Sequence, residues 1–164
     1  MGDPRPIYVA PLFALSGLVS WGLFEYAIHR FVLHAPRPLF GRRLSIAAEH
    51  VEHHRNPQAL EPLRNPIKTI LPVALLYGML AWAITGSWRD TAYLLGGFTA
   101  GYLYYEWFHA AAHHGAPRLK PLREARKYHL HHHYADPTTR YGVTSPVFDL
   151  LFGTLGVRHV SRDN

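Results

Sequence analysis

The sequence predicts an all-α integral membrane protein, with about three transmembrane helices and a histidine-rich helical cap on the cytoplasmic side. Three observations lead to this fold class. Apolar runs long enough for membrane helices alternate with polar stretches. Four histidine clusters lie in or beside the polar stretches, and the basic residues collect on one side of the predicted membrane. A chain of 164 residues is expected to form a single domain over 1–164.

The first apolar run covers residues 7–28 and contains one charge, Glu25. At about 1.5 Å per residue, a run of this length crosses a hydrocarbon core of about 30 Å. A cleaved signal peptide is the alternative. However, no basic segment beyond Arg5 precedes the run, which leads directly into a histidine cluster. We therefore expect the first transmembrane helix here.

Two further apolar runs predict the other two helices. No charge occurs from Thr69 to Trp88, where Pro72 falls in the first turn of the expected helix. A polar turn at 86–90 separates this run from the third, Thr91–Tyr105. Residues 35–68 are polar and interrupted by prolines, with a short helix expected near 44–54. Beyond His113 the chain is polar except for Val147–Leu155, which predicts a short interfacial helix.

The distribution of charge predicts the orientation. If the chain crosses the membrane three times, residues 30–68 and 109–164 share one side and carry 15 of the 17 lysines and arginines. The positive-inside rule places that side in the cytoplasm and the N-terminus outside. Membrane orientation thus accounts for the net charge of +6. We expect no nucleic-acid binding, because the sequence carries no nucleic-acid-binding motif.

Histidine is the unusual residue of this chain, which has 13 histidines and no cysteine. Any metal must therefore be held by His, Asp, Glu or Tyr. The motifs are HX4H at 29–34, HXXHH at 50–54, HX3HH at 109–114 and HXXHH within 129–133. Positions i, i+3 and i+4 share one face of an α-helix, so each HXXHH motif is expected to direct three imidazoles to one place.

The HX4H motif is the exception, because positions five apart on an α-helix point about 140° away from each other. Either His34 turns back at a fraying helix end near Pro36, or His29 and His34 serve different metals. The four motifs together hold more imidazoles than one ion takes, since zinc is satisfied by about four ligands. Two ions with about five ligands each fit the count, and imidazole suits Fe, Zn, Cu and Ni. The alternative is that the histidines are incidental and form no metal site. Four spaced clusters on one predicted face disfavour this alternative.

These motifs, in this order around a membrane hairpin, resemble the fatty acid hydroxylase / sterol desaturase superfamily from about Glu25 to Thr154. Residues 128–134, 141–146 and 148–154 are most similar to the fatty acid 2-hydroxylase branch. The resemblance implies that the metal ligands are His29, His34, His50, His53, His54, His109, His113, His129, His132 and His133.

Other residues fall beside this ligand pattern. His114, His131 and His159 lie outside it. Glu106, where the family often has Asp, is expected to accept a hydrogen bond from a ligand imidazole; a structural carboxylate paired with arginine is the alternative. Tyr134 and Asp149 match family positions, and the sequence assigns them no role.

The resemblance implies an oxidoreductase that hydroxylates an acyl chain of a membrane lipid, fatty acid 2-hydroxylase-like. Its cofactors would be two metal ions, iron or alternatively zinc, with O2 as co-substrate. Some relatives carry a fused cytochrome b5 domain and larger ones have four spans. Here a separate electron donor, a ferredoxin or cytochrome b5-like protein, is expected to dock on the basic cytoplasmic face.

Three alternatives remain open. A carotenoid or sterol hydroxylase or desaturase of the same superfamily differs only in its substrate. A zinc-dependent membrane hydrolase needs a carboxylate base, for which Glu49, Glu52 and Glu106 are candidates. A metal transporter would place polar ligands near the bilayer midplane, whereas the histidines here lie at the ends of the predicted spans.

Overall fold

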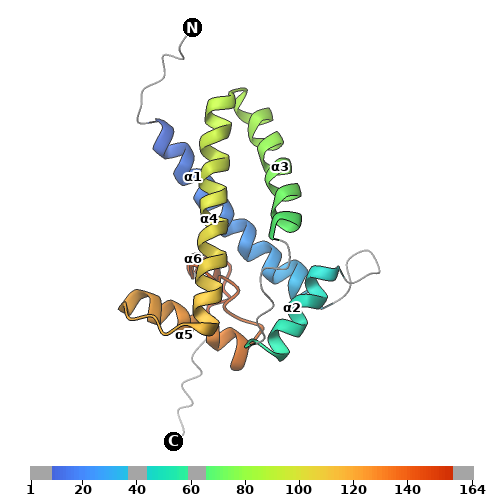
Figure 1. Ribbon diagram of the computed structural model, residues 1–164, viewed down its shortest axis with the longest axis vertical. Helices are drawn as coiled ribbons and strands as arrows, with labels where there is room; N and C mark the ends of the chain where they lie inside the picture. Colours follow the sequence, from blue (N-terminus) through green and yellow to red (C-terminus); the bar gives the residue numbers. More distant parts are fainter. Residues whose placement is uncertain (1–8, 37–43, 59–65, 157–164) are drawn as a thin grey trace, which may run out of the picture. The chain divides into compact units, whose positions relative to one another are not determined.

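The computed structural model describes residues 9–36, 44–58 and 66–156, and every regular element within them is helical (Figure 1). The elements are α1 (Val9–Ile28), the π-helical turn η1 (His29–Leu33), α2 (Ser45–Arg55), α3 (Pro66–Thr85), α4 (Trp88–His114), α5 (Lys120–Tyr134) and α6 (Val147–Leu151). Outside the described residues lie Arg5, Arg37, Arg42, Arg43, Arg64, Arg158, Arg162 and His159.

Each predicted helix has a counterpart, but several limits differ: α4 begins at Trp88, inside the expected turn at 86–90, and α6 ends at Leu151 and not at Leu155. The third apolar run and the third histidine cluster form one continuous helix of 27 residues, α4. Helix α3 begins at Pro66, before the uncharged run, so Pro72 lies inside the helix and not in its first turn. A proline at the first helical position is favoured because its fixed φ suits a helix and its missing N–H has no partner there.

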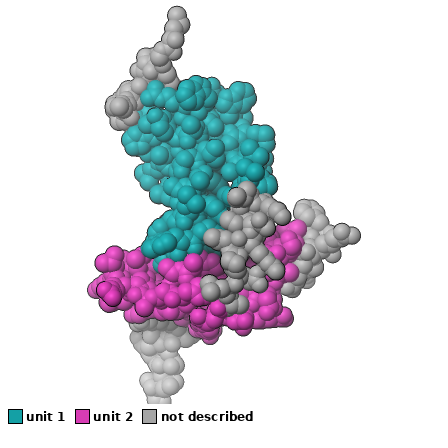
Figure 2. Space-filling view, viewed as in Figure 1, with its two compact units in different colours: residues 1–24, 59–108 teal, residues 25–58, 109–164 magenta. Residues whose placement is uncertain are grey.

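Length and composition qualify one helical segment, Val9–Leu33, to cross a membrane among the described residues. Residues Ile70–Thr85 form a shorter apolar helix. The chain divides into two compact units, residues 1–24 with 59–108 and residues 25–58 with 109–164 (Figure 2). Each unit is assembled from two separate parts of the chain. The expectation of a single domain over 1–164 stays a prediction.

In the first unit, α3 and α4 run side by side and are joined by two residues, Gly86 and Ser87 (Figure 1). The core is aromatic: Trp21 packs edge-on against Phe98 and Tyr102, and Tyr77 stacks on Phe98 at a centroid distance of 4.2 Å. The outward side chains are large and apolar, and those exposed by more than half on α3 are Leu71, Leu75, Leu76, Met79, Leu80, Trp82 and Ile84. So large an exposed apolar surface is typical of a helix that faces lipid.

Two glycines allow α1 and α4 to approach through their backbones. A Cβ atom on Gly97 would clash with the carbonyl oxygen of Ala14, and one on Gly17 would clash with that of Leu94. Small residues permit this approach in membrane helices, where packing takes the place of hydrophobic burial.

Replacing Gly97 by alanine is therefore expected to destabilise the first unit by about 2 kcal/mol, since backbone atoms cannot move aside cheaply. Gly96 is the matched control: it is exposed on the same helix, and a Cβ there would meet nothing within 4 Å. Gly96→Ala should instead raise stability slightly, because alanine favours the helical backbone. Thermal unfolding of both variants in detergent measures the difference, and equal midpoints would contradict this account of the packing.

Candidate metal centre

The second unit brings ten histidines together in two groups of five, and these are the ten that the sequence singles out. Within each group one nitrogen from every histidine lies within 4.8 Å of the others. The first group is His29, His34, His50, His54 and His132. The second group is His53, His109, His113, His129 and His133.

The turn η1 explains how the HX4H motif serves one group. His34 N–H donates to the carbonyl of His29 at 3.1 Å, a hydrogen bond across five residues. This wider turn returns the chain to the same face after five residues, where an α-helix would have passed it. The ring centroids of His29 and His34 are consequently 5.0 Å apart. His29 and His34 belong to one group, so the alternative that they serve different metals is wrong.

Helices α2 and α5 each contribute to both groups, which corrects the expectation that an HXXHH motif directs three imidazoles to one place. On α2, His50 and His54 belong to the first group and His53 to the second. On α5 the division is reversed, since His129 and His133 belong to the second group and His132 to the first. The reason is angular: residues four apart differ by about 40° around the helix, whereas the residue at i+3 points about 60° to the other side.

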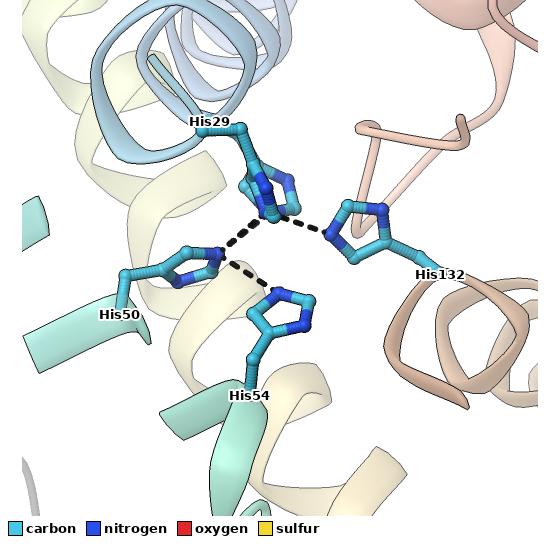
Figure 3. A group of neighbouring side chains, drawn as sticks. His29, His50, His54 and His132 are labelled. Carbon is cyan, nitrogen blue, oxygen red and sulfur yellow. Dashed lines mark hydrogen bonds between the residues drawn. The ribbon is translucent and has the colours of Figure 1, made fainter. Parts of the chain in front are cut away.

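In the first group the Nε2 atoms face one another. The Nε2 atom of His50 lies 2.9 Å from that of His34, 3.2 Å from that of His29 and 3.1 Å from that of His54. His132 Nε2 lies 3.0 Å from His34 Nε2. Figure 3 shows His29, His50, His54 and His132 directed inward from three separate segments of the chain. One nitrogen cannot make good hydrogen bonds to three others, so the arrangement suits a shared cation better than a hydrogen-bond network.

Two backbone carbonyls fix the tautomers of two histidines of this group. His29 Nδ1 lies 2.5 Å from the carbonyl oxygen of Tyr141, and His132 Nδ1 lies 2.6 Å from that of Thr139. A carbonyl only accepts, so both Nδ1 atoms carry the proton and both Nε2 atoms present a lone pair to the group. Histidines that bind metal ions typically donate their other N–H in this way.

The second group shows the same convergence. The Nε2 atom of His53 lies 2.9 Å from that of His109 and 3.2 Å from that of His113, which lies 2.9 Å from that of His129. Within the described part of the chain, the buried Nε2 atom of His133 has no hydrogen-bond partner. One nitrogen of His133 lies within 4.8 Å of those of the other four histidines, and a buried nitrogen without a hydrogen-bond partner can donate its lone pair to a metal ion. Both groups therefore fit one metal ion each.

Comparison with known proteins agrees with this geometry. The family model described as fatty acid hydroxylase matches residues 14–154. The chain belongs to the fatty acid hydroxylase family. It is 32% identical over 153 residues to a dihydroceramide fatty acyl 2-hydroxylase of Arabidopsis thaliana, covering 92% of this chain and 64% of that protein. It is also 32% identical over 157 residues to a ceramide very long chain fatty acid hydroxylase of Schizosaccharomyces pombe, covering 92% of this chain and 44% of that protein.

A solved structure has the same fold. Full-length scs7p, of which only the hydroxylase domain is visible, superposes with a TM-score of 0.80 at 28% identity, covering 92% of this chain and 58% of that one. This chain of the fatty acid hydroxylase family thus spans less than two thirds of the length of these relatives.

In this hydroxylase-family fold, burial keeps the histidines neutral. Removal from water, followed by repulsion from His132 and other imidazoles, lowers the pKa of His54 to about 3. The same causes, burial first and His132 second, lower the pKa of His34 to about 4. Burial also lowers the pKa of His50, His132 and His133. Neutral imidazoles can donate a lone pair to a metal ion at neutral pH.

The lowered pKa values predict the pH dependence of the metal-free chain. Between the ordinary pKa of 6.5 and the folded pKa of about 4 at His34, the unfolded state binds more protons than the folded state. Stability should therefore fall as the pH drops through this window and depend little on these groups above it. Unfolding midpoints of chelator-treated chain, measured from about pH 8 to about pH 4.5, test this. A flat profile would show that the imidazoles are not protected from protonation.

The remaining predicted residues have varied positions. His114 is exposed, His131 is half-buried and Tyr134 is exposed; none belongs to either group. Glu106 is half-buried on α4, three residues before His109, and its hydrogen bond to an imidazole stays a prediction. Glu49 and Glu52 are exposed, and Glu52 pairs with Arg55 at 3.4 Å. Neither is buried with the histidines, so of the three candidate bases of a hydrolase only Glu106 is partly buried.

Sequence reasoning missed the role of Glu25 and assigned none to Asp149. Both carboxylates are buried, with 6% and 0% of the residue exposed, and both accept hydrogen bonds from the segment that contains Tyr141. The signal for Glu25 was available, because a lone charge in an apolar run requires a buried partner. No signal in the sequence identifies the carbonyls of Thr139 and Tyr141, since every residue has one.

Proposed function

We propose that this chain hydroxylates an acyl chain of a membrane lipid at carbon 2, with O2 as the oxidant and two iron ions as the cofactor. The observation that carries the proposal is the pair of five-histidine groups built on the same two helices, α2 and α5. Relatives named for the 2-hydroxylation of dihydroceramide acyl chains and the hydroxylation of ceramide fatty acids support the substrate class. Carotenoid or sterol oxidation is the less favoured alternative.

The reaction balances with an external donor. One oxygen atom of O2 enters the C–H bond and the other leaves as water, which requires two electrons and two protons from a separate ferredoxin or cytochrome b5-like protein. The two ions, when bound, supply the activation of O2 and the oxidant that attacks the C–H bond. The ten histidines would act as ligands: burial keeps the imidazoles neutral, and His29 and His132 direct their Nε2 lone pairs into the first group.

We propose that α1, α3 and α4 are the membrane spans and that the histidines lie on the cytoplasmic side. The exposed apolar side chains of the first unit support this assignment. The described basic residues of the second unit are Arg30, Arg55, Arg118, Lys120, Arg123, Arg126, Lys127 and Arg140. Their charge would steer an acidic electron donor, so reduction should slow markedly with added salt. Reduction that is insensitive to salt would contradict this docking.

The proposal is tested by lipid mass spectrometry of an aerobic host that expresses the chain with a ferredoxin and its reductase. Acyl lipids that gain one oxygen with the intact chain, and not with His132→Ala, would support a lipid hydroxylase and identify its substrate. Fragmentation locates the hydroxyl group. New products only in a host that makes carotenoids or sterols would favour the alternative substrate class, and lipid cleavage without O2 would favour a hydrolase.

A further inference from the structure

Two buried carboxylates hold four consecutive backbone amides beside the first histidine group. Asp149 accepts hydrogen bonds from the N–H groups of Tyr141 at 2.8 Å and Gly142 at 2.7 Å. Glu25 accepts from the N–H groups of Val143 at 2.7 Å and Thr144 at 3.0 Å, and also from the Thr144 hydroxyl at 2.7 Å. Hydrogen bonds to a carboxylate are about twice as strong as neutral ones, so segment 141–144 is firmly fixed.

The same segment carries an acceptor for the first group. The peptide group between Tyr141 and Gly142 donates its N–H to Asp149 Oδ2 and accepts the Nδ1 proton of His29 on its carbonyl oxygen. One peptide group therefore links a buried negative charge to a histidine of the group. Hydrogen bonds in such a chain polarise one another, and the polarised carbonyl holds the His29 proton more strongly.

The backbone of the segment leaves no room for a different arrangement. A Cβ atom on Gly142 would clash with the carbonyl of Ser145 and lie 2.8 Å from Asp149 Oδ2. Arg140, between the two carbonyls that accept from histidines, has a φ of 58°, which is costly for a residue with a side chain. Its N–H donates to the carbonyl of Thr154 at 2.7 Å, which helps to hold this conformation.

Three histidines of the second group differ from His29 and His132 in this respect. Considering only the described residues, the buried Nδ1 atoms of His113, His129 and His133 have no hydrogen-bond partner. The two groups thus have the same number of imidazoles and differ in the hydrogen bonds of these Nδ1 atoms.

We propose that Glu25 and Asp149 are positioning residues for the first group alone: by fixing peptides 141–144 they set the orientation of His29 and raise the affinity of that group for its metal ion. This inference rests on the proposed two-metal function. Neither carboxylate lies among the nitrogens of the two groups, so each would act through the backbone.

The test measures Zn2+ affinity by chelator competition on the full chain in detergent, in two backgrounds. His53→Ala removes a ligand of the second group and leaves the first intact, whereas His50→Ala does the reverse, so the affinity of the tighter Zn2+ site is read in each background. Adding Glu25→Gln should weaken Zn2+ binding about 10-fold or more in the His53→Ala background and leave it unchanged in the His50→Ala background. Equal losses in both backgrounds, or none in the first, would overturn the inference.

Two further measurements separate positioning from a general loss of structure. The visible absorption of Co2+ bound to the first group should change with Glu25→Gln in the His53→Ala background, while that of the second group stays the same. If Glu25→Gln fails to fold, Thr144→Val replaces it, and Thr144→Ser, which keeps the hydroxyl, should restore affinity. An intact chain that binds fewer than two ions would instead overturn the two-metal proposal.

Discussion

The double variant His50→Ala/His53→Ala is expected to weaken metal binding at both groups by removing one ligand from each, whereas His50→Ala/His54→Ala is expected to empty the first group and leave the second intact. The reason is the division of ligands on α2: His50 and His54 belong to the first group, and His53 belongs to the second. Three imidazoles directed to one place would give a different result, because both double variants would then remove two ligands from the same site. Both variants should reduce hydroxylation by about 100-fold or more, since the loss of a residue that only hydrogen-bonds to a metal ligand already lowers metal affinity or activity 10- to 100-fold.

Metal content per chain by elemental mass spectrometry separates these outcomes, with lipid hydroxylation as the second measurement. His114→Ala is the matched control, because His114 is exposed, follows a group member in sequence and belongs to neither group. It should keep two ions and full activity. If both double variants emptied one site and left the other intact, the division of α2 between the groups would be wrong.

Replacing Asp149 by alanine should produce the largest loss of stability in the second unit. Asp149 has none of its surface exposed and accepts hydrogen bonds from two backbone N–H groups and the hydroxyl of Thr154 at 2.7 Å. The variant leaves these donors buried without an acceptor, at a cost of about 1–3 kcal/mol for each group. We expect a total loss of about 3–5 kcal/mol, partly relieved by water.

Chemical denaturation in detergent measures this loss. Asp149→Asn should be less damaging, because the amide keeps one oxygen acceptor of the same size. Glu124→Ala removes an exposed carboxylate that pairs only with Lys127 among the described contacts, and it should leave the unfolding midpoint essentially unchanged. If Asp149→Ala were as mild as Glu124→Ala, the buried carboxylate would not hold segment 141–144.

Local signals in the sequence predicted α1, α3 and α4, and the family resemblance named the ten histidines that the structure brings together. Long apolar runs and regular histidine spacings are local signals, and they located α1, α3, α4 and the four motifs. Helix limits were less accurate: α3 begins earlier at Pro66, because polar residues extend a helix beyond its apolar stretch. The number of helices that cross a membrane stays a prediction.

The assignment of histidines to groups could be predicted only in part. Helical angles separate His53 from His50 and His54, but which histidines of the other segments join each of them depends on tertiary packing. The π-helical turn between His29 and His34 likewise has no sequence signature, since HX4H is compatible with a fraying α-helix. Support from the carbonyls of Thr139 and Tyr141 depends on long-range folding.

The division of α2 and α5 between the groups has a mechanical consequence. Each helix carries nitrogens of both groups on adjacent sides, so a rotation of a few degrees about its axis moves ligands in the two groups together. A change of ligand position in one group would therefore be transmitted to the other group through α2 and α5. Metal ions held by the two groups would accordingly be coupled and not independent.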